Sequence, residues 1–446
     1  MRILLDQAVH DHRNRGNNSL LEVTRDRFRE LWPDAVFDVI SNSPYFCKIF
    51  LEDVHPVDQR TFTEYQGRFD RISKYVPNPI WRLVFEGREL LKQKGGLELT
   101  SQDARRVFGR SNGSEWSQQP DSQSSASGQV IVGESTADPY ASIAQYDLYV
   151  PTGGGYLCDS DKRFLIPLFD RLEAAQNRGV LTFMVGQGIG PLEDPELLKR
   201  AGDVLPKLDY LLVREEKLTR PLLNSLGVPP ERVLMTGDDA IEPAYLVRKV
   251  KLGQGIGLSL RVAKYTDFNQ SHIDAIRPAI LSAAEKYNAE LVSAPIDSND
   301  ADKEYVAELM KGYGRTSSSW RKFESTTAVI RRISRCRIMV TGTFHGAVFA
   351  LSQGIPVIGL ANSIEYRNKL FGLATEFGAQ GCQILMLKDE DLAENLRKAI
   401  DFAWSSAESL RPQLLDAAER QIDLGYSAYH KIFSLAASRL AEKTAD

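Results

Sequence analysis

The sequence has few cysteines, and they are not arranged as a binding site. Cys47, Cys158, Cys336 and Cys382 lie far apart, with no CxxC pair and no histidine at the spacing of a zinc ligand set. This absence excludes a disulfide-stapled secreted scaffold and a cysteine-based metal site. We predict that the four thiols are reduced and mostly structural, in a protein of the cytosol.

Signals for export and for membrane insertion are also lacking. The N-terminal residues MRILLDQAVHDHRNRG become charged after a short apolar run and contain no secretory cleavage pattern. No segment offers the ~18 uninterrupted apolar residues that cross a bilayer. We therefore expect a cytoplasmic protein without a membrane span, which reaches the inner membrane surface only through a partner or a lipid-linked substrate.

A surplus of positive charge is absent as well. The chain has 55 Lys and Arg against 59 Asp and Glu, a net charge of -4, so nucleic-acid binding is not expected as its main role. The 43% hydrophobic and 26% charged residues are typical of a globular protein. A chain of 446 residues exceeds what one core usually organises, so we expect two or three domains.

The most informative stretch is Arg337 to Leu360, which reads RIMVTGTFHGAVFALSQGIPVIGL. Its pattern predicts a buried strand over 338–340, a glycine-bearing turn over 341–345, and a helix that begins at Gly346. A second strand is predicted over 356–360. The stretch is therefore a compact βαβ unit of a parallel sheet.

His345 would lie at the carboxyl end of the first of these strands. In an open parallel sheet ligands collect at that edge, where helix N-termini present free N–H groups. Thr341 and Thr343 offer hydroxyls, and glycine at Gly342 and Gly346 allows a ligand to approach the backbone closely. A core histidine in a tight turn is the alternative interpretation of the same pattern.

The N-terminal part of the chain predicts a second βαβ arrangement. Strands are expected over 2–5 and 36–40, with a helix from about Ser19 to Trp32 between them. Asn17 and Asn18 stand in the polar loop before that helix. They either cap the helix or contact a ligand.

Two glycine clusters follow strands in this part of the chain. Gly153 to Gly155 come after a predicted strand over 147–150, and the sequence GQGIGPL over 186–192 follows one over 180–185. Because carboxyl ends of parallel strands share one edge, both clusters are expected at the same edge of the sheet. Arg214 ends a further predicted strand over 208–213.

The predicted organisation is an α/β protein with two Rossmann-like domains. The N-terminal domain covers 1–245 and contains a mobile surface insertion near 111–128, which is rich in Ser, Gln and Gly. The second domain covers 246–420, and a C-terminal helix over 421–446 packs back on the body. Residues 44 to 110 are uninformative.

Two adjacent aspartates lie near the predicted domain boundary. Asp238 and Asp239 follow a short strand over 233–235. They either bind a metal or act as a base, or, as is commoner for aspartates in a turn, cap the next helix.

Arg261 and His345 both follow strands of the second domain and are expected to project into the crevice between the domains. A guanidinium binds carboxylate or phosphate, and a histidine donates or accepts a proton near neutral pH. A helix N-terminus disfavours imidazolium, so His345 is expected to be neutral until an anion binds.

The order of these motifs resembles the polysaccharide pyruvyl transferase family. The segments that carry the resemblance are YDLYVPTGGGYLCD, GQGIGPL, LLVREEKL, GIGLSLR and above all TGTFHGAVFALSQGIPVIGL. The resemblance implies two Rossmann-like domains facing each other across a cleft, in a glycosyltransferase-B-like arrangement. It also implies transfer of a pyruvyl group from phosphoenolpyruvate to sugar hydroxyls, as a ketal, in exopolysaccharide or cell-surface glycan synthesis.

The resemblance implies roles for residues of both domains. His345 would protonate the enol carbon or hold the phosphate, and Arg261 would bind a carboxylate or the phosphate. No metal and no organic cofactor are expected, only phosphoenolpyruvate and a sugar or lipid-linked oligosaccharide acceptor. The donor-binding candidates are Thr341, Thr343, Phe344, Gly346, Glu365 and Lys369. The acceptor-binding candidates are Asn17, Asn18, Gly153, Gly154, Gly155, Gln187 and Arg214.

The chain departs from the family's pattern at three places. Members often carry arginine where this chain has Thr343, which removes a bidentate cation from the donor site. Their glycine-aspartate and arginine-aspartate pairs are here Gly16-Asn17 and Arg214-Glu215. A nucleotide-sugar-dependent glycosyltransferase, with Glu365 on a ribose, and a catalytically decayed glycan-binding protein therefore stay as alternatives.

Overall fold

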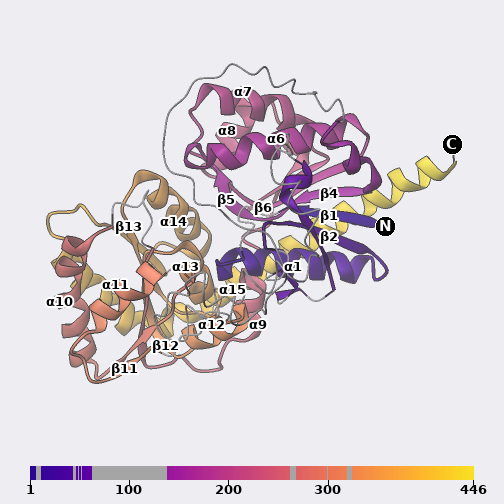
Figure 1. Cartoon of the computed structure of the whole chain (residues 1–446). Coiled ribbons are helices and arrows are strands. Elements are labelled where there is room, and N and C mark those ends of the chain that lie inside the picture. The colour runs from indigo at the N-terminus through magenta and orange to yellow at the C-terminus, as the bar shows by residue number, and fades with distance from the viewer. Residues whose placement is uncertain are drawn as a thin grey trace, which may run out of the picture. The chain divides into compact units, whose positions relative to one another are not determined.

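The computed structural model describes residues 1–6, 12–43, 47–48, 50–51, 53–62, 138–261, 268–298, 300–318 and 324–445. The insertion predicted near 111–128 lies outside these ranges. The chain divides into two compact units, Met1–Phe62 with Ser142–Asp446, and Thr63–Ala141. The elements that form the candidate site belong to the first unit (Figure 1).

The first sheet is parallel and has the strand order β3-β2-β1-β4-β6-β7-β8, with β5 paired to β6. Most of its central positions are buried, as expected for strands covered by helices on both faces. Its strands are β1 (Arg2–Asp6), β2 (Val36–Ser41), β3 (His55–Asp58), β4 (Leu148–Pro151), β5 (Gly154–Leu157), β6 (Leu181–Ile189), β7 (Tyr210–Val213) and β8 (Val233–Met235).

The second sheet is also parallel, with the order β11-β10-β9-β12-β13-β14. The predicted βαβ unit over 337–360 lies at its centre, where β12 pairs with β9 and β13. Its strands are β9 (Gly255–Ser259), β10 (Glu290–Ser293), β11 (Thr316–Ser317), β12 (Cys336–Thr341), β13 (Val357–Ala361) and β14 (Cys382–Met386).

Helices connect successive strands and cover the sheets. In Figure 1, α6, α7 and α8 lie on one face of the first sheet, and α1 lies on the other. The helices are α1 (Arg15–Leu31), α6 (Lys162–Asn177), α7 (Pro195–Val204), α8 (Thr219–Ser225), α9 (Ile241–Leu246), α10 (Gln270–Lys286), α11 (Asp300–Met310), α12 (Thr326–Ile333), α13 (Phe344–Leu351), α14 (Ile364–Phe377) and α15 (Leu392–Ala445). The alternation of strand and helix gives two Rossmann-like lobes, named here the first and second lobe after their sheets.

Helix α15 packs on both lobes. Its first half buries Leu396 and Ile400 in a core shared with the second sheet and α10. Its last third buries Ile432 and Ala436 in the core of the first sheet, so the C-terminal helix packs back on the body as predicted.

The C-terminal helix was predicted to begin at residue 421, and that start is wrong. One helix runs from Leu392 to Ala445. The residues before 421 also bury apolar side chains, among them Leu410 and Leu414, so nothing ends the helix there.

Three predicted element boundaries also differ from the structure. Helix α1 begins at Arg15, because the side chain of Asn14 caps it. The glycines at 154 and 155 begin strand β5, and β6 continues to Ile189 because its residue Gln187 pairs with Gly154 of β5. Local glycine content indicated turns, but pairing between strands decided the conformation.

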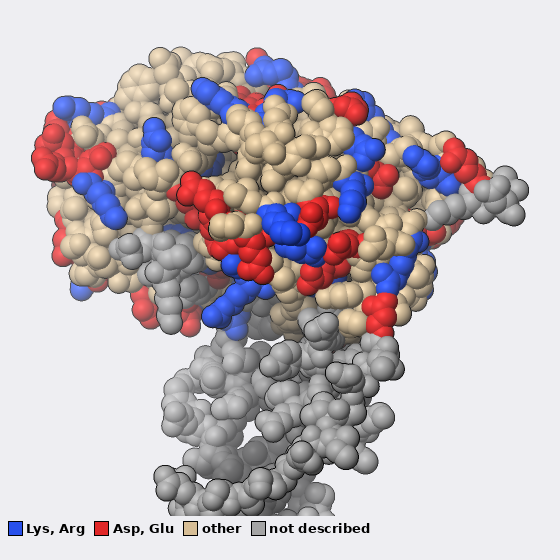
Figure 2. Space-filling model, turned by 90° about the horizontal axis from the view of Figure 1, so that it is seen from above, with Lys and Arg blue, Asp and Glu red and all other residues tan. Residues whose placement is uncertain are grey.

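Other predictions from composition hold in the described residues. The four cysteines are free and buried, and burial raises the pKa of each thiol to about 12. No helix in the described part of the chain combines the length and apolar character that a bilayer crossing requires. On the face shown in Figure 2, acidic and basic side chains are interspersed.

Candidate active site

His345 lies in the first turn of α13, directly after β12. Thr343 is extended and α13 begins at Phe344, two residues before the predicted helix start at Gly346. The His345 side chain is buried, with 8% of the residue exposed. Within the described ranges, its Nε2 atom has no hydrogen-bond partner. Because buried polar atoms are normally paired, this nitrogen is a candidate contact for a ligand.

The imidazole of His345 lies against the first turn of α1, which comes from the first lobe. A Cβ atom built on Gly16 would lie 2.1 Å from both Cγ and Nδ1 of the ring. Only glycine leaves room for the imidazole at this place. The Gly16-Asn17 segment, predicted either to cap a helix or to contact a ligand, is thus the first turn of a helix, in contact with His345.

Backbone hydrogen bonds hold this end of α1 on the second lobe. The N–H of Arg15 donates to the carbonyl of Ile296 at 2.8 Å, and the N–H of Ser298 donates to the carbonyl of Arg13 at 3.1 Å. Between them Asn14 and Asp297 form an antiparallel bridge. Residues from both lobes therefore build the surroundings of His345.

Asp238 lies between His345 and an arginine. Its Oδ2 atom is 3.9 Å from His345 Nε2 and 3.3 Å from Arg214 Nη1. Its Oδ1 atom accepts a hydrogen bond from the N–H of Ala240 at 2.9 Å. Asp238 thus caps the following turn, as the sequence analysis allowed, and also places a buried carboxylate beside the candidate catalytic histidine.

The two glycine clusters of the first lobe make room for Arg214. A Cβ atom on Gly188 would lie 2.4 Å from Nε of Arg214, and one on Gly155 would lie 2.7 Å from Nη2. The guanidinium carbon stacks 3.9 Å from the ring centroid of Phe344 on the second lobe. The clusters predicted to contact a ligand through their backbone therefore support a buried arginine.

Lys369 reaches the same place from α14 of the second lobe. A Cβ atom built on Gly155 would lie 3.2 Å from Cε and 3.5 Å from Nζ of Lys369. The same Cβ position is 2.7 Å from Nη2 of Arg214, so the two side chains lie side by side. Nζ also pairs with Glu365 at 2.6 Å. Two cations from different lobes converge here, which favours an anion at this position.

A pocket of about 260 Å³ opens beside these two cations. Its walls come from both lobes and combine apolar side chains with charged ones. The lining residues are Gly188, Ile189, Gly190, Pro191, Leu192, Glu193, Arg214, Glu215, Leu218, Leu222, Asn368 and Lys369.

Burial determines the charge of His345 in the free protein. It lowers the pKa of the imidazole from its usual 6.5 to about 4, with Arg214 acting in the same direction and Asp238 opposing it. His345 is therefore neutral at pH 7, as predicted. Burial also lowers the pKa of Arg214, although Asp238 favours its charged form.

Arg261 follows β9 as predicted but lies among carboxylates. Its Nη1 atom bonds Asp297 at 2.6 Å and is 3.5 Å from Asp302. Asp297 also accepts a hydrogen bond from Asn14 at 3.4 Å. The structure thus places Arg261 with the residues that join the lobes, and gives His345 a different arginine, Arg214.

The hydroxyls of the predicted donor turn bind one another. Thr343 Oγ1 is 2.9 Å from Thr341 Oγ1 and 3.0 Å from Ser259 Oγ. Gly346 packs over them, since a Cβ there would be 2.4 Å from Thr343 Oγ1. These buried hydroxyls stabilise the turn that carries His345.

The other predicted acceptor residues serve mainly the backbone of the first lobe. Gln187 donates to the carbonyls of Thr152 and Val185, both at 2.9 Å. Asn18 is buried and donates to the carbonyl of His12 at 3.1 Å. Gly153 packs on Gly186 and Leu20, Gly154 pairs in β5, and Asn17 donates its N–H to the Asn14 cap.

Asp239 has a separate, structural position. It bonds Arg27 at 2.8 Å and accepts a hydrogen bond from Tyr429 at 3.1 Å, which joins α1 to α15. Burial raises the pKa of its carboxyl to about 6. Among the described residues, no group of three or more His, Cys, Asp or Glu is placed to hold a metal ion.

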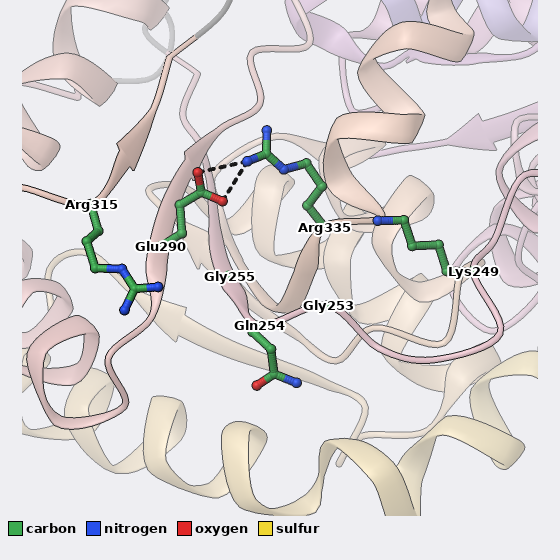
Figure 3. A pocket seen from close by; sticks show the side chains of 7 residues that line it. All are labelled: Lys249, Gly253, Gln254, Gly255, Glu290, Arg315 and Arg335. Carbon is green, nitrogen blue, oxygen red and sulfur yellow. Dashed lines mark hydrogen bonds and ion pairs between the residues drawn. The ribbon is translucent and has the colours of Figure 1, made fainter.

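A second pocket, of about 300 Å³, lies where β9 and β10 begin (Figure 3). Two of its charged lining residues neutralise each other, because Arg335 binds both carboxylate oxygens of Glu290 at 2.8 and 2.7 Å. The lining residues Gly255 and Glu290 are the first residues of β9 and β10, so the pocket lies at the amino ends of these strands, whereas His345 follows the carboxyl end of β12. Ligands of parallel sheets bind at carboxyl ends, so His345, and not this pocket, marks the candidate active site.

Sequence reasoning missed the pairing of Asp238 with His345 and Arg214. All three follow strands, so the rule that located His345 also located the other two at the carboxyl edges of their sheets. Arg214 and Asp238 follow the neighbouring strands β7 and β8 of the first sheet, but His345 comes from the second sheet, so the sequence contains no signal that it meets them.

Comparison with known proteins gives one family and one fold. A family model described as polysaccharide pyruvyl transferase matches residues 14–364. No curated protein sequence matches the chain.

Solved structures with a similar fold have little sequence identity to this chain. The S. aureus MnaA-UDP co-structure has a TM-score of 0.53 at 12% identity, covering 94% of each chain. A putative UDP-N-acetylglucosamine 2-epimerase from Listeria monocytogenes gives 0.53 at 14%, covering 96% of this chain and 97% of that chain. UGT73P12 from Glycyrrhiza uralensis, complexed with glycyrrhetinic acid 3-O-monoglucuronide, gives 0.53 at 10%, with 100% and 97% covered. These similarities confirm the glycosyltransferase-B-like fold.

Proposed function

The chain belongs to the polysaccharide pyruvyl transferase family, and from this premise we propose that it transfers a pyruvyl group from phosphoenolpyruvate to two hydroxyls of a sugar. The product would be a cyclic ketal on an exopolysaccharide or cell-surface glycan precursor. The observation that supports this best is the unpartnered Nε2 of His345 close to Arg214, with Lys369 reaching the same place. An acid beside two cations suits a small substrate with a phosphate, a carboxylate and a reactive double bond.

In the proposed reaction, His345 donates a proton to the methylene carbon of phosphoenolpyruvate, and the central carbon becomes electrophilic. One sugar hydroxyl adds to that carbon and loses its proton. Phosphate then leaves with the electron pair of its C–O bond, and the second hydroxyl adds and loses its proton. One hydroxyl proton returns to His345 and the other leaves with phosphate or solvent, so the reaction balances without a cofactor.

Arg214 and Lys369 would supply the positive charge that Thr343 does not. The family's arginine two residues before the histidine is absent, and the Thr343 hydroxyl is already bonded to Ser259 and Thr341. Arg214 stacks on Phe344 at the wall of the pocket. We therefore assign the donor's anionic groups to Arg214 and Lys369, which moves Arg214 from the acceptor to the donor.

A nucleotide-sugar-dependent glycosyltransferase is the second candidate. The fold similarity to a UDP co-structure favours it, although the identity of 12% restricts that similarity to the fold. A glycan-binding protein without activity is the third. The three candidate functions predict different results in one assay.

The test is incubation of the full chain with phosphoenolpyruvate and a panel of galactose-, mannose- and glucuronate-containing acceptors, with phosphate release as the readout. We expect release that requires both substrates and falls about 1,000-fold or more in His345→Ala. His430→Ala changes an exposed histidine on α15 and serves as the matched control. Turnover with a uridine diphosphate sugar instead would establish a glycosyltransferase. No turnover with any donor would favour a glycan-binding protein without activity.

A further inference from the structure

We propose that Asp238 is a positioning residue for His345, and that its carboxylate changes partner from Arg214 to the imidazole when an anion binds at Arg214. The proposal rests on the proposed pyruvyl transfer and deepens it. It explains how His345 becomes protonated by the action of Asp238, a residue that the family resemblance did not include. Substrate binding would thereby favour the charged form of His345.

The geometry of the carboxylate permits the exchange. Oδ1 of Asp238 is held by the N–H of Ala240 at 2.9 Å, so the carboxylate keeps its place. Oδ2 faces both neighbours, 3.3 Å from Arg214 Nη1 and 3.9 Å from His345 Nε2. At 3.9 Å, Oδ2 is close enough to stabilise a positive charge on the imidazole and still leaves the proton on Nε2 to the substrate.

His345 has no other partner that would compete. Its Nε2 is buried without a hydrogen bond among the described residues. Its own helix presents Phe344 and Phe349 to the ring, and α1 presents Gly16. The charged groups that act on it are Asp238, from the turn after β8, and Arg214, from the end of β7.

An anion at Arg214 would reverse the balance of these charges. In the free protein, burial and Arg214 keep the pKa of His345 near 4, so the ring carries no proton to donate at pH 7. A bound phosphate or carboxylate forms stronger, bidentate hydrogen bonds with a guanidinium than this 3.3 Å contact. Released from Arg214, Asp238 would favour imidazolium through its negative charge, and Nε2–H would face the substrate.

The exchange has a measurable proton balance. His345 takes up one proton from solvent at Nε2 when the anion binds, and no bond other than this N–H is formed. Binding of phosphoenolpyruvate should therefore be linked to the uptake of about 0.8 proton at pH 5, which lies between the free pKa of about 4 and a bound pKa about 2 units higher. Calorimetry in buffers of different ionisation enthalpy measures that number.

The direct test is titration of the histidine side chains by nuclear magnetic resonance in the full chain. The His345→Gln variant identifies the resonance, and spectra are recorded from pH 3.5 to 8 without ligand, with inorganic phosphate and with phosphoenolpyruvate, with no acceptor present. We expect the pKa of His345 to rise by about 2 pH units when either anion saturates the site. In Asp238→Asn, which keeps an acceptor for Ala240, we expect little or no rise.

Glu216→Gln is the matched control, since it removes a negative charge two residues from Arg214, from a carboxylate that pairs with Arg220 and does not line the pocket. It should retain the rise. An equal rise in Asp238→Asn, no rise in the unmodified chain, or no binding of either anion would each overturn the proposal. If Asp238→Asn does not fold, proton uptake by the unmodified chain decides, because uptake near zero contradicts the exchange.

Kinetics separates this role from a purely structural one. Asp238→Asn should lower kcat about tenfold or more, shift the basic limb of its pH profile to lower pH, and leave KM for phosphoenolpyruvate nearly unchanged. The titration needs no acceptor and no turnover. A chain that shows the linked titration but transfers no pyruvyl group would contradict the proposed function and leave the role of Asp238 standing.

Discussion

At the scale of single residues, glycines determine what the site can hold. Gly16 leaves space for the His345 ring, and Gly155 and Gly188 leave space for Arg214. At each glycine, the space that a Cβ atom would fill is occupied by the side chain of His345 or Arg214. A substitution at these positions should therefore displace a candidate catalytic group before it disturbs the fold.

Gly16→Ala tests this at the histidine. The new Cβ would lie 2.1 Å from Cγ and Nδ1 of His345, so the ring must move. Because a displacement of about 1 Å costs on the order of 100-fold in rate, we expect kcat to fall by that factor. Gly314→Ala is the control, since nothing lies within 4 Å of its added Cβ. Equal activity of both variants would show that the position of His345 does not limit the reaction.

The sequence predicted some of these residues and not their contacts. His345 was predictable because strand, turn and helix over 337–360 are local in sequence. Arg214 was predicted at the edge where the structure places it, and its assignment to the acceptor or to the donor stays a prediction. Its contact with Asp238, and the binding of Arg261 to Asp297, depend on side-chain directions between distant segments, which no local pattern determines.

At the scale of elements, α15 is the helix that both lobes share. Near its start the helix buries Leu396 in the core of the second sheet, and near its end it buries Ile432 in the core of the first sheet. Tyr429 of the same helix bonds Asp239 and Thr24. The helix thus contributes to the stability of both sheets.

Truncation of one apolar side chain on α15 should show this contribution. Ile432 is 0% exposed in the core of the first sheet, so Ile432→Ala should lower the free energy of unfolding by about 2–4 kcal/mol. Leu424, on the same helix, is 45% exposed, and Leu424→Ala should change it by less than about 0.5 kcal/mol. Urea denaturation monitored by circular dichroism measures both. Similar costs at the two sites would mean that the end of α15 is not packed on the first sheet.

Element types were more predictable than their limits. Continuous apolar runs identified β1, β4 and β12 correctly, because strands of a parallel sheet are buried on both faces. The start of α1 and the length of α15 were wrong. The first depends on the Asn14 side chain bonding Gly16 and Asn17, and the second on contacts with both sheets.

At the scale of the whole molecule, the lobes are joined by a partly buried carboxyl as well as by backbone pairing. Glu22 of α1 accepts a hydrogen bond from Thr326 of α12 at 3.3 Å. Burial raises the pKa of this carboxyl from 4.5 to about 7. The folded protein therefore binds the proton of Glu22 more tightly than the unfolded chain does.

This raised pKa makes stability depend on pH. The contribution of Glu22 is fully present below pH 4.5 and is lost as the pH rises through about 7. Glu22→Gln keeps an acceptor for Thr326 and removes the titration. From pH 4.5 to pH 8, the free energy of unfolding of this variant should rise by on the order of 2 kcal/mol relative to the unmodified chain. Parallel pH profiles of the two proteins would contradict the assignment.

Ligand binding across the lobes should also raise thermal stability. At a concentration about 100 times its Kd, phosphoenolpyruvate should stabilise the fold by ~2.7 kcal/mol and raise Tm by several degrees. Uridine diphosphate should have no such effect. In Lys369→Met the shift should be smaller, since one of the two converging cations is lost. Stabilisation by uridine diphosphate alone would favour the glycosyltransferase.

The path of α15 also bears on how the protein is made. On the ribosome, the face of the first sheet that Ile432 and Ala436 cover stays open until almost the whole chain has been translated. Until these residues are made, this face of the first sheet exposes apolar side chains to solvent. Exposed apolar surface is what chaperones bind on a growing chain.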